Sequence, residues 1–315
     1  MLSLWTPAER LRFQIIISLV VLDAILLAVG PMRVDGTSLL VPVLATSAML
    51  GLAIWYRGRK EATLSTIIAG TAQLIAFTAA GATLNYVLMP FTGPLMDPFF
   101  FGLDQAVGIH WPSLFASIKS NAWLSPVLTI AYLSTLLQVA LVVPILGILQ
   151  RVPQLDHFLL ALMVSLIVTI AVWAAFPSFG AGPHLYATGQ MTSFPGAVLG
   201  DDYARLMMAL KSGQIRDFSL ADAEGLIGFP SYHTVMALLT VYAMRGVRTA
   251  FWPMLAWNAL VIMAVPVDGA HNVCDAFGGM LVAWASIAIS HRLLAWADAS
   301  AQRRTVNAAP VTFRS

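Results

Sequence analysis

The sequence predicts an all-α membrane protein, a polytopic bundle of about eight transmembrane helices. Three observations lead to this fold class. Of the 315 residues, 59% are hydrophobic and only 10% are charged, and the mean hydropathy of +0.80 is far above that of soluble domains. Apolar runs long enough to cross a bilayer as helices recur along the chain. Lysine and arginine alternate between the two sides that these runs would separate.

The apolar runs define the expected transmembrane helices. The first run follows Arg10 and Arg12, as the apolar part of a signal peptide would. It is long, contains Asp23 and lacks a small-residue cleavage site, so we expect it to remain as a helix. The expected spans are residues 12–30, 38–56, 63–90, 127–150, 158–176, 231–246, 249–267 and 275–293.

The positive charges predict the orientation of the chain. Twelve lysine and arginine residues share one side with both termini, and five lie on the other side. The positive-inside rule therefore places the termini in the cytoplasm and His233 and His271 on the extracytoplasmic side. Ten acidic residues share the histidine side, so that five positive charges minus ten negative ones leave −5 there. Because such a surface does not attract a polyanion, we expect no nucleic-acid partner.

Two long connections, residues 91–126 and 177–230, lie on the histidine side. Asp97 and Pro98 predict the start of an amphipathic interfacial helix, with Asp97 as its N-cap, and a second short helix follows Trp111. In the larger connection, Asp201 and Asp202 predict a helix that ends at Gly213. This second connection fits a lid over a lipid substrate and a solvated connector equally well.

The first candidate chemical motif is Gly-Phe-Pro-Ser-Tyr-His at residues 228–233. Pro230 can open a helix without losing a needed hydrogen bond, which places His233 in the first turn. The free N–H groups of that turn, together with Ser231, offer a place for a phosphoryl oxygen. A histidine at this position can protonate a departing alkoxide.

The second motif is Gly-Ala-His-Asn-Val-Cys-Asp at residues 269–275. His271 and Asp275 are four residues apart and would share one helix face, where the carboxylate can orient the imidazole as a nucleophile. A metal site with His233 as third ligand is the less favoured interpretation. We interpret Cys274, the only cysteine, as a packing residue on another face.

Two further features concern packing. Gly278 and Gly279 predict a close approach of the last span to the sixth span. Asp23 lies in the middle of the first span, where a hydrogen bond to a neighbouring helix explains it better than a role in a proton path.

The paired motifs, Phe-Pro-Ser-x-His and His-x-x-x-Asp followed by two glycines, resemble those of the type-2 phosphatidic acid phosphatase superfamily. Within it, the chain is most similar to the branch that includes inositolphosphorylceramide synthase, an inositolphosphotransferase of sphingolipid metabolism. Asp97, Asp104 and Trp111 match an Asp-x6-Asp-x6-Trp pattern of bacterial members. The resemblance implies a six-helix core formed by spans three to eight. It divides the chain into two N-terminal helices (1–60), the catalytic core (61–295) and a cytoplasmic tail (296–315).

The resemblance also implies residue roles. His271 would form a phosphohistidine, Asp275 would orient it, and His233 would protonate the leaving group, with no cofactor or metal. Ser231 and Tyr232 would contact the substrate. The Lys-x6-Arg-Pro element of classical members is missing, and position 265, where they have Arg, is Val. Either a less charged phosphodiester is the substrate, or other cations on the histidine side replace this clamp, namely Lys119, Arg205, Lys211 or Arg216.

These observations predict a lipid phosphotransferase or phosphatase of a bacterial inner membrane, acting at the extracytoplasmic surface. Transfer to a lipid or polyol hydroxyl is slightly favoured over transfer to water, because a diester headgroup suits the missing clamp and the negative surface. A transporter or channel with a proton relay through His233, His271, Asp275 and Asp23 ranks second. A purely structural membrane scaffold ranks third, because it gives no reason for clustered ionisable groups.

Overall fold

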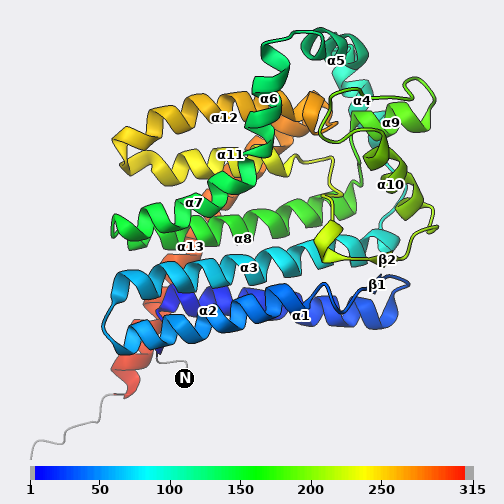
Figure 1. Ribbon diagram of the computed structural model, residues 1–315. Coiled ribbons are helices and arrows are strands. Elements are labelled where there is room, and N and C mark those ends of the chain that lie inside the picture. The colour runs from blue at the N-terminus through cyan, green and yellow to red at the C-terminus, as the bar shows by residue number, and fades with distance from the viewer. Residues whose placement is uncertain (1–3, 309–315) are drawn as a thin grey trace, which may run out of the picture.

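The computed structural model describes residues 4–308, and their side chains up to residue 303. Within this part of the chain, thirteen α-helices form a bundle, and a single two-stranded parallel ladder is the only sheet, which confirms the all-α prediction. Most of the long helices run side by side across the bundle, while the short helices α4, α5, α9 and α10 gather at one end of it (Figure 1). The two histidine motifs precede helices that start toward this end.

The N-terminal part contributes three long helices, α1 (Pro7–Val29), α2 (Leu40–Gly58) and α3 (Ala62–Leu88), with strand β1 (Arg33–Val34) between the first two. Thr6 and Glu9 form a capping box at the start of α1. Glu9 also pairs with Arg57 of α2 at 2.8 Å, and Arg12 pairs with Asp156 at 2.7 Å. These ion pairs connect the first helix to α2 and to α8 (Val152–Ala175).

The middle of the chain forms a short 3-10 helix, η2 (Met89–Phe91), followed by α4 (Asp97–Ala106), α5 (Trp111–Lys119), α6 (Leu124–Leu133), α7 (Thr135–Ile148) and α8 (Val152–Ala175). Helices α4 and α5 confirm the two short helices expected here. The cap of α4 differs from the prediction, because Met96 occupies the N-cap and Asp97 is the first helical residue. The Asp97 carboxylate instead accepts hydrogen bonds from residues 178–180.

The last part comprises α9 (Ala181–Ala187), α10 (Asp201–Lys211), β2 (Asp217–Phe218), η3 (Leu220–Asp222), α11 (Tyr232–Ala243), η4 (Met244–Gly246), α12 (Arg248–Asp268) and α13 (Val273–Ala308). Helix α10 confirms the helix expected before Gly213. Strand β2 pairs with β1, so the connection after α1 is joined to the segment that leads to the first motif.

The structure has six or seven candidate membrane spans within the described residues, against about eight expected. Each expected run contains helix, but six helices of the described chain are long and apolar enough to cross a membrane. Residues 127–150 form α6 and α7, which are bent by 50° and would make a seventh span together. Helix α11 has 12 residues, about 18 Å, because Ser231 caps its start and η4 follows at Met244. It is shorter than the roughly 30 Å hydrocarbon core.

Two local expectations also change. Helix α13 continues to Ala308 without a break, so the expected boundary at residue 296 falls inside a helix, and residues 309–315 of the expected tail lie outside the described residues. Asp23 is buried, but its Oδ1 atom has no hydrogen-bond partner within the described part of the chain. The expected hydrogen bond from a neighbouring helix to this oxygen is therefore absent there.

Candidate active site

The two motifs meet at the starts of α11 and α13. The backbone N–H of Ser231 donates to the carbonyl oxygen of Asp275 at 3.0 Å. A Cβ on Gly278 would lie 2.5 Å from the Phe229 ring, and one on Gly279 would lie 2.5 Å from the Ser231 carbonyl oxygen. These positions need glycine because the two chains are in contact, which confirms the predicted close approach.

His271 and Asp275 contact each other as predicted. The His271 Nδ1 and Asp275 Oδ2 atoms are 3.2 Å apart, and the backbone N–H of Asn272 donates to the same oxygen at 2.9 Å. His271 precedes α13 rather than lying within it, and Ala270 turns the chain with a φ of 55°. A proton on Nδ1 that is donated to Asp275 leaves the lone pair on Nε2 for chemistry.

His233 reaches the same region through an aromatic residue, Tyr132 of α6. The two rings are stacked, with centroids 4.1 Å apart and planes 21° from parallel. A Cβ on Gly269 would lie 2.9 Å from Tyr132 Cε2 and 2.7 Å from His271 Cδ2, so the Tyr132 ring lies next to both imidazoles. His233 and His271 are close enough to interact electrostatically. The structure thus brings the two histidines together.

Asp97 positions a backbone segment beside the His271 loop. Its Oδ1 atom accepts hydrogen bonds from Ser178 Oγ at 2.7 Å, Phe179 N at 2.9 Å and Gly180 N at 2.8 Å. Burial raises the pKa of Asp97 to about 6, while these hydrogen bonds oppose the rise. Gly180 lies against the backbone of Ala270, where any Cβ would overlap the carbonyl oxygen. Asp97 therefore holds residues 178–180, which pack against the loop that carries His271.

Asp104 and Trp111 hold the same loop more directly. The Asp104 carboxylate accepts from the backbone N–H groups of Val273 at 2.6 Å and Cys274 at 3.0 Å, and so caps the start of α13. The Trp111 indole N–H donates to the His271 carbonyl oxygen at 2.9 Å. All three residues of the Asp-x6-Asp-x6-Trp pattern thus fix the backbone around His271.

Ser231 and Tyr232, the expected substrate-binding residues of the first motif, make hydrogen bonds within the protein. Ser231 is buried and caps α11, with its Oγ accepting from Thr234 N at 3.4 Å. Pro230 therefore precedes the cap and is not the first helical residue. The Tyr232 hydroxyl donates to the Leu162 carbonyl oxygen at 3.3 Å, toward α8.

The four candidate cations take up different positions. The Lys119 Nζ atom lies 2.7 Å from Asp268 Oδ1, and Asp268 immediately precedes the second motif. Arg205 pairs with the exposed Asp202 on α10. Lys211 donates to the Thr92 hydroxyl and to backbone carbonyls of residues 92 and 93, and Arg216 donates to the Gly213 carbonyl. Of the four, Lys119 is held beside the His271 loop, while the other three are engaged on or near α10.

The fold and site agree with the comparison of the sequence with protein-family models. The model of the PAP2 superfamily matches residues 98–289. The chain belongs to the PAP2 superfamily. Neither the search of curated proteins nor the search of solved structures returned a match. PAP2 membership indicates a membrane lipid phosphatase or phosphotransferase. The matched region runs from α4 into α13 and leaves α1 to α3 outside it.

Several buried polar atoms without partners lie at this PAP2 site. Within the described residues, buried atoms that lack a hydrogen bond include the Tyr132 hydroxyl, the Thr234 hydroxyl, Asp268 Oδ2 and both side-chain atoms of Asn272. Buried polar groups in proteins are nearly always paired. Their gathering around two histidines indicates groups that remain available for a ligand. The same part of the chain shows no group of three or more His, Cys, Asp or Glu residues arranged to hold a metal ion.

None of these four residues, Tyr132, Thr234, Asp268 and Asn272, was predicted as a site residue. Asn272 follows His271 directly, so its position in the motif was a usable signal. Tyr132 lies in an apolar run of α6, and only packing against His233 and Gly269 reveals its place.

Proposed function

We propose that this PAP2 protein transfers a lipid phosphate ester through a covalent phosphohistidine. In the first step His271 Nε2 bonds to phosphorus, the bond from phosphorus to the leaving oxygen breaks, and His233 gives that oxygen a proton. In the second step an acceptor hydroxyl attacks the same phosphorus, the bond to Nε2 breaks, and His233 takes the hydroxyl proton. Asp275 holds the His271 ring and stabilises its positive charge.

The contact between His271 Nδ1 and Asp275 Oδ2 carries this proposal. The pair is almost completely buried, with 5% and 0% of the side chains exposed. The ring is therefore fixed, and Nε2 has no hydrogen-bond partner among the described residues that would occupy its lone pair. His233 supports the proposal as proton donor because the Tyr132 ring contacts it and adjoins His271.

Neutral donors suit a diester substrate better than a monoester. The side-chain N–H groups of Asn272 and the hydroxyl of Tyr132 are buried and unpartnered within the described chain, and both can donate to a phosphoryl oxygen. Lys119 is neutralised by Asp268, so it does not provide a free cation. A phosphodiester carries less charge than a monoester, which favours headgroup transfer as in the inositolphosphorylceramide synthase branch. The acceptor would be a lipid or polyol hydroxyl, and water would give hydrolysis.

The charge distribution supports an extracytoplasmic site. The positive-inside rule places the connections that carry α4, α5, α9 and α10 outside the cytoplasm, and the two motifs begin beside these connections. We propose a bacterial inner-membrane location on this basis and on the Asp-x6-Asp-x6-Trp pattern.

A label-transfer assay tests the function. The purified protein in lipid nanodiscs is given glycerophospholipids with a labelled phosphate together with ceramide, diacylglycerol or inositol as acceptors. Label in a second lipid indicates a transferase, label in a soluble polyol phosphate indicates transfer to a polyol, and label in inorganic phosphate or a free headgroup phosphate indicates hydrolysis. Rapid acid-free quenching should trap label on His271.

Matched variants separate the roles of the residues. We expect His271→Ala to remove turnover and trapped label, and His233→Ala to slow turnover by about 10²- to 10⁴-fold. Asp275→Asn should lower kcat by up to about 10⁴-fold, as the loss of an orienting carboxylate does in other triads. The exposed His110, replaced by Ala, is the control and should leave turnover unchanged. Full activity of both His271→Ala and His233→Ala would refute the mechanism.

A further inference from the structure

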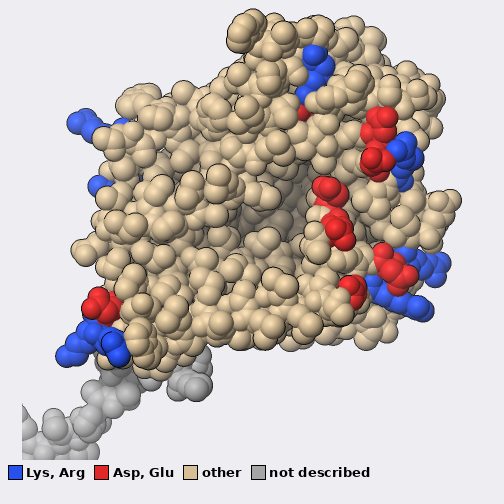
Figure 2. All heavy atoms as spheres, in the orientation of Figure 1, with Lys and Arg blue, Asp and Glu red and all other residues tan. Residues whose placement is uncertain are grey.

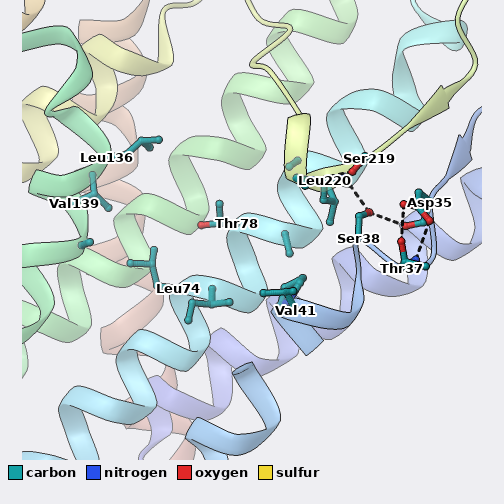
Figure 3. A pocket seen from close by; sticks show the side chains of 16 residues that line it. Asp35, Thr37, Ser38, Val41, Leu74, Thr78, Leu136, Val139, Ser219 and Leu220 are labelled. Carbon is teal, nitrogen blue, oxygen red and sulfur yellow. Dashed lines mark hydrogen bonds between the residues drawn. The ribbon is translucent and has the colours of Figure 1, made fainter. Parts of the chain in front are cut away.

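An open groove lies on one face of the bundle, and none of the candidate active-site residues lines it. It has a volume of about 740 Å³ and is lined mainly by α2, α3, α7 and η3. Figure 2 shows a hollow on this face. In Figure 3 the side chains of Leu74, Thr78, Leu136 and Val139 line the apolar part, and Asp35, Thr37, Ser38 and Ser219 lie at one end.

The groove is lined both by residues of the matched PAP2 region and by residues that precede it. Helices α2 and α3 precede the matched residues 98–289, whereas α7 and η3 lie within them. The two parts are joined at the polar end, where Leu220 N donates to Ser38 Oγ at 3.1 Å and Asp35 N donates to the Phe218 carbonyl oxygen at 2.8 Å. The N-terminal helices therefore add a wall that the PAP2 region alone does not have.

The apolar part has the depth of one membrane leaflet. On α3 the lining residues run from Leu74 to Ala82, a rise of about 12 Å, against about 15 Å for half of the hydrocarbon core. Val41 and Leu136 on its edges are 74% and 65% exposed, so the groove is open toward the surrounding bilayer. A single acyl chain of a lipid can enter sideways and lie along these walls.

The polar end carries hydrogen-bond acceptors and negative charge. Asp35 is the only charged residue that lines the groove, and hydrogen bonds from the Thr37 hydroxyl and backbone lower the pKa of Asp35, which keeps it ionised. Asp222 and Glu224 follow a few residues after Ser219, and Figure 2 shows acidic side chains beside the hollow. This end attracts an ammonium or hydroxyl group and repels a headgroup of net negative charge.

We propose that this groove is a lipid-binding site for a membrane lipid with one acyl chain along α3 and α7 and a net-neutral headgroup whose ammonium or hydroxyl donors contact Asp35. The site is separate from His271 and does not require its chemistry. The N-terminal helices thereby give this PAP2 chain a second lipid contact next to its catalytic core.

Photolabelling tests the proposal without relying on turnover. The His271→Ala protein in nanodiscs is exposed to phosphatidylethanolamine or to phosphatidic acid, each with a photoactivatable group on one acyl chain. Labelled peptides are then identified by mass spectrometry. We expect phosphatidylethanolamine to label residues 74–82 and 136–140 at least fivefold more than phosphatidic acid does.

Two substitutions and a control complete the test. Thr78→Trp should fill the groove and reduce labelling of these segments at least fivefold, while Asp35→Asn should reduce the preference for the net-neutral lipid. Leu281→Trp, on a 69% exposed position of α13 outside the groove, should change neither. Equal labelling by both lipids, or labelling that Thr78→Trp leaves unchanged, would mean that only bulk bilayer lipid contacts this face and would overturn the proposal. Because the readout is labelling, it is independent of whether His271 is a nucleophile.

Discussion

Trp111 donates its indole N–H to the carbonyl oxygen of His271 at 2.9 Å, across 160 positions of the chain. The indole is almost completely buried and stacks on Phe115, so helix α5 fixes the backbone of the proposed nucleophile. Asp104, seven residues before Trp111, accepts hydrogen bonds from the backbone N–H groups of Val273 and Cys274 at the start of α13. Asp104 near the end of α4 and Trp111 at the start of α5 thus both contact the backbone at the start of α13.

Replacing Trp111 by Phe should test this support. The aromatic stacking on Phe115 is retained, but the hydrogen bond to His271 is lost, which costs about 0.5 to 1.5 kcal/mol of unfolding free energy. We expect a larger effect on kcat than on KM, because the substitution loosens the nucleophile without touching bound lipid. Steady-state kinetics together with thermal unfolding in detergent measure both effects. Phe115→Leu removes the stacking alone, and equal losses of kcat in the two variants would contradict the special role of the hydrogen bond.

Much of this site could be predicted from the sequence, because its chemistry lies in short motifs. His233, His271 and Asp275 are marked by spacing alone, and Gly278 and Gly279 indicated the contact that brings the motifs together. The Asp97, Asp104 and Trp111 pattern was visible as well. The hydrogen bonds that these three side chains make could not be predicted, because a spacing of seven does not tell which distant backbone groups the side chains will reach.

The remaining features depend on tertiary packing. Tyr132 has no local signal, since a tyrosine in an apolar run is typical of any membrane helix, and its role arises from contact with His233. Hydropathy also predicted about eight spans, whereas six or seven candidate spans are present in the described residues. It detects apolar runs but not the bend between α6 and α7 or the early end of α11. The pairing of Lys119 with Asp268 likewise joins residues that are 149 positions apart.

Gly279→Ala should push the two catalytic motifs apart. The added Cβ would lie 2.5 Å from the Ser231 carbonyl oxygen and 2.9 Å from Thr234 Cβ, and neither neighbour is the free end of a side chain. We expect a loss of about 1 to 3 kcal/mol of stability and reduced turnover. Gly51→Ala on α2 is the matched control, because a Cβ there meets nothing within 4 Å, and alanine favours a helix over glycine. Thermal unfolding that falls equally for both would show that the contact is not restrictive.

Lys119→Met should destabilise the protein by leaving a buried carboxylate without its partner. The side chains of Lys119 and Asp268 are 6% and 0% exposed, and breaking such a pair costs about 3 to 5 kcal/mol. The double variant Lys119→Met, Asp268→Asn should recover most of this loss, since it removes the uncompensated charge. Lys211→Met, at a lysine that donates to backbone and hydroxyl oxygens, is the control for a buried-pair effect. A stable Lys119→Met protein with a strongly raised KM would instead make Lys119 a substrate-binding cation.

Tyr132→Phe should lower activity without lowering stability. The phenylalanine ring keeps the stacking on His233, so the proton donor stays in place. The hydroxyl is buried and unpartnered among the described residues, and its removal therefore breaks no hydrogen bond of the free protein. If it donates to a phosphoryl oxygen, its loss should cost about 1.5 to 3 kcal/mol, or roughly 10- to 150-fold in kcat/KM. Kinetics and thermal unfolding of the same sample provide the measurement.

Tyr86→Phe gives the opposite pattern and makes the test decisive. Tyr86 is also buried, but its hydroxyl oxygen accepts a hydrogen bond from Glu224 N at 2.9 Å. Removing this hydroxyl leaves a backbone N–H without its partner, so the melting temperature should fall while turnover per folded molecule stays near that of the wild type. The two tyrosines thus separate a hydroxyl kept for the substrate from one used by the fold. A Tyr132→Phe protein that melts earlier and turns over normally would assign Tyr132 to the fold as well, and Asn272 would then be the remaining neutral donor beside His271.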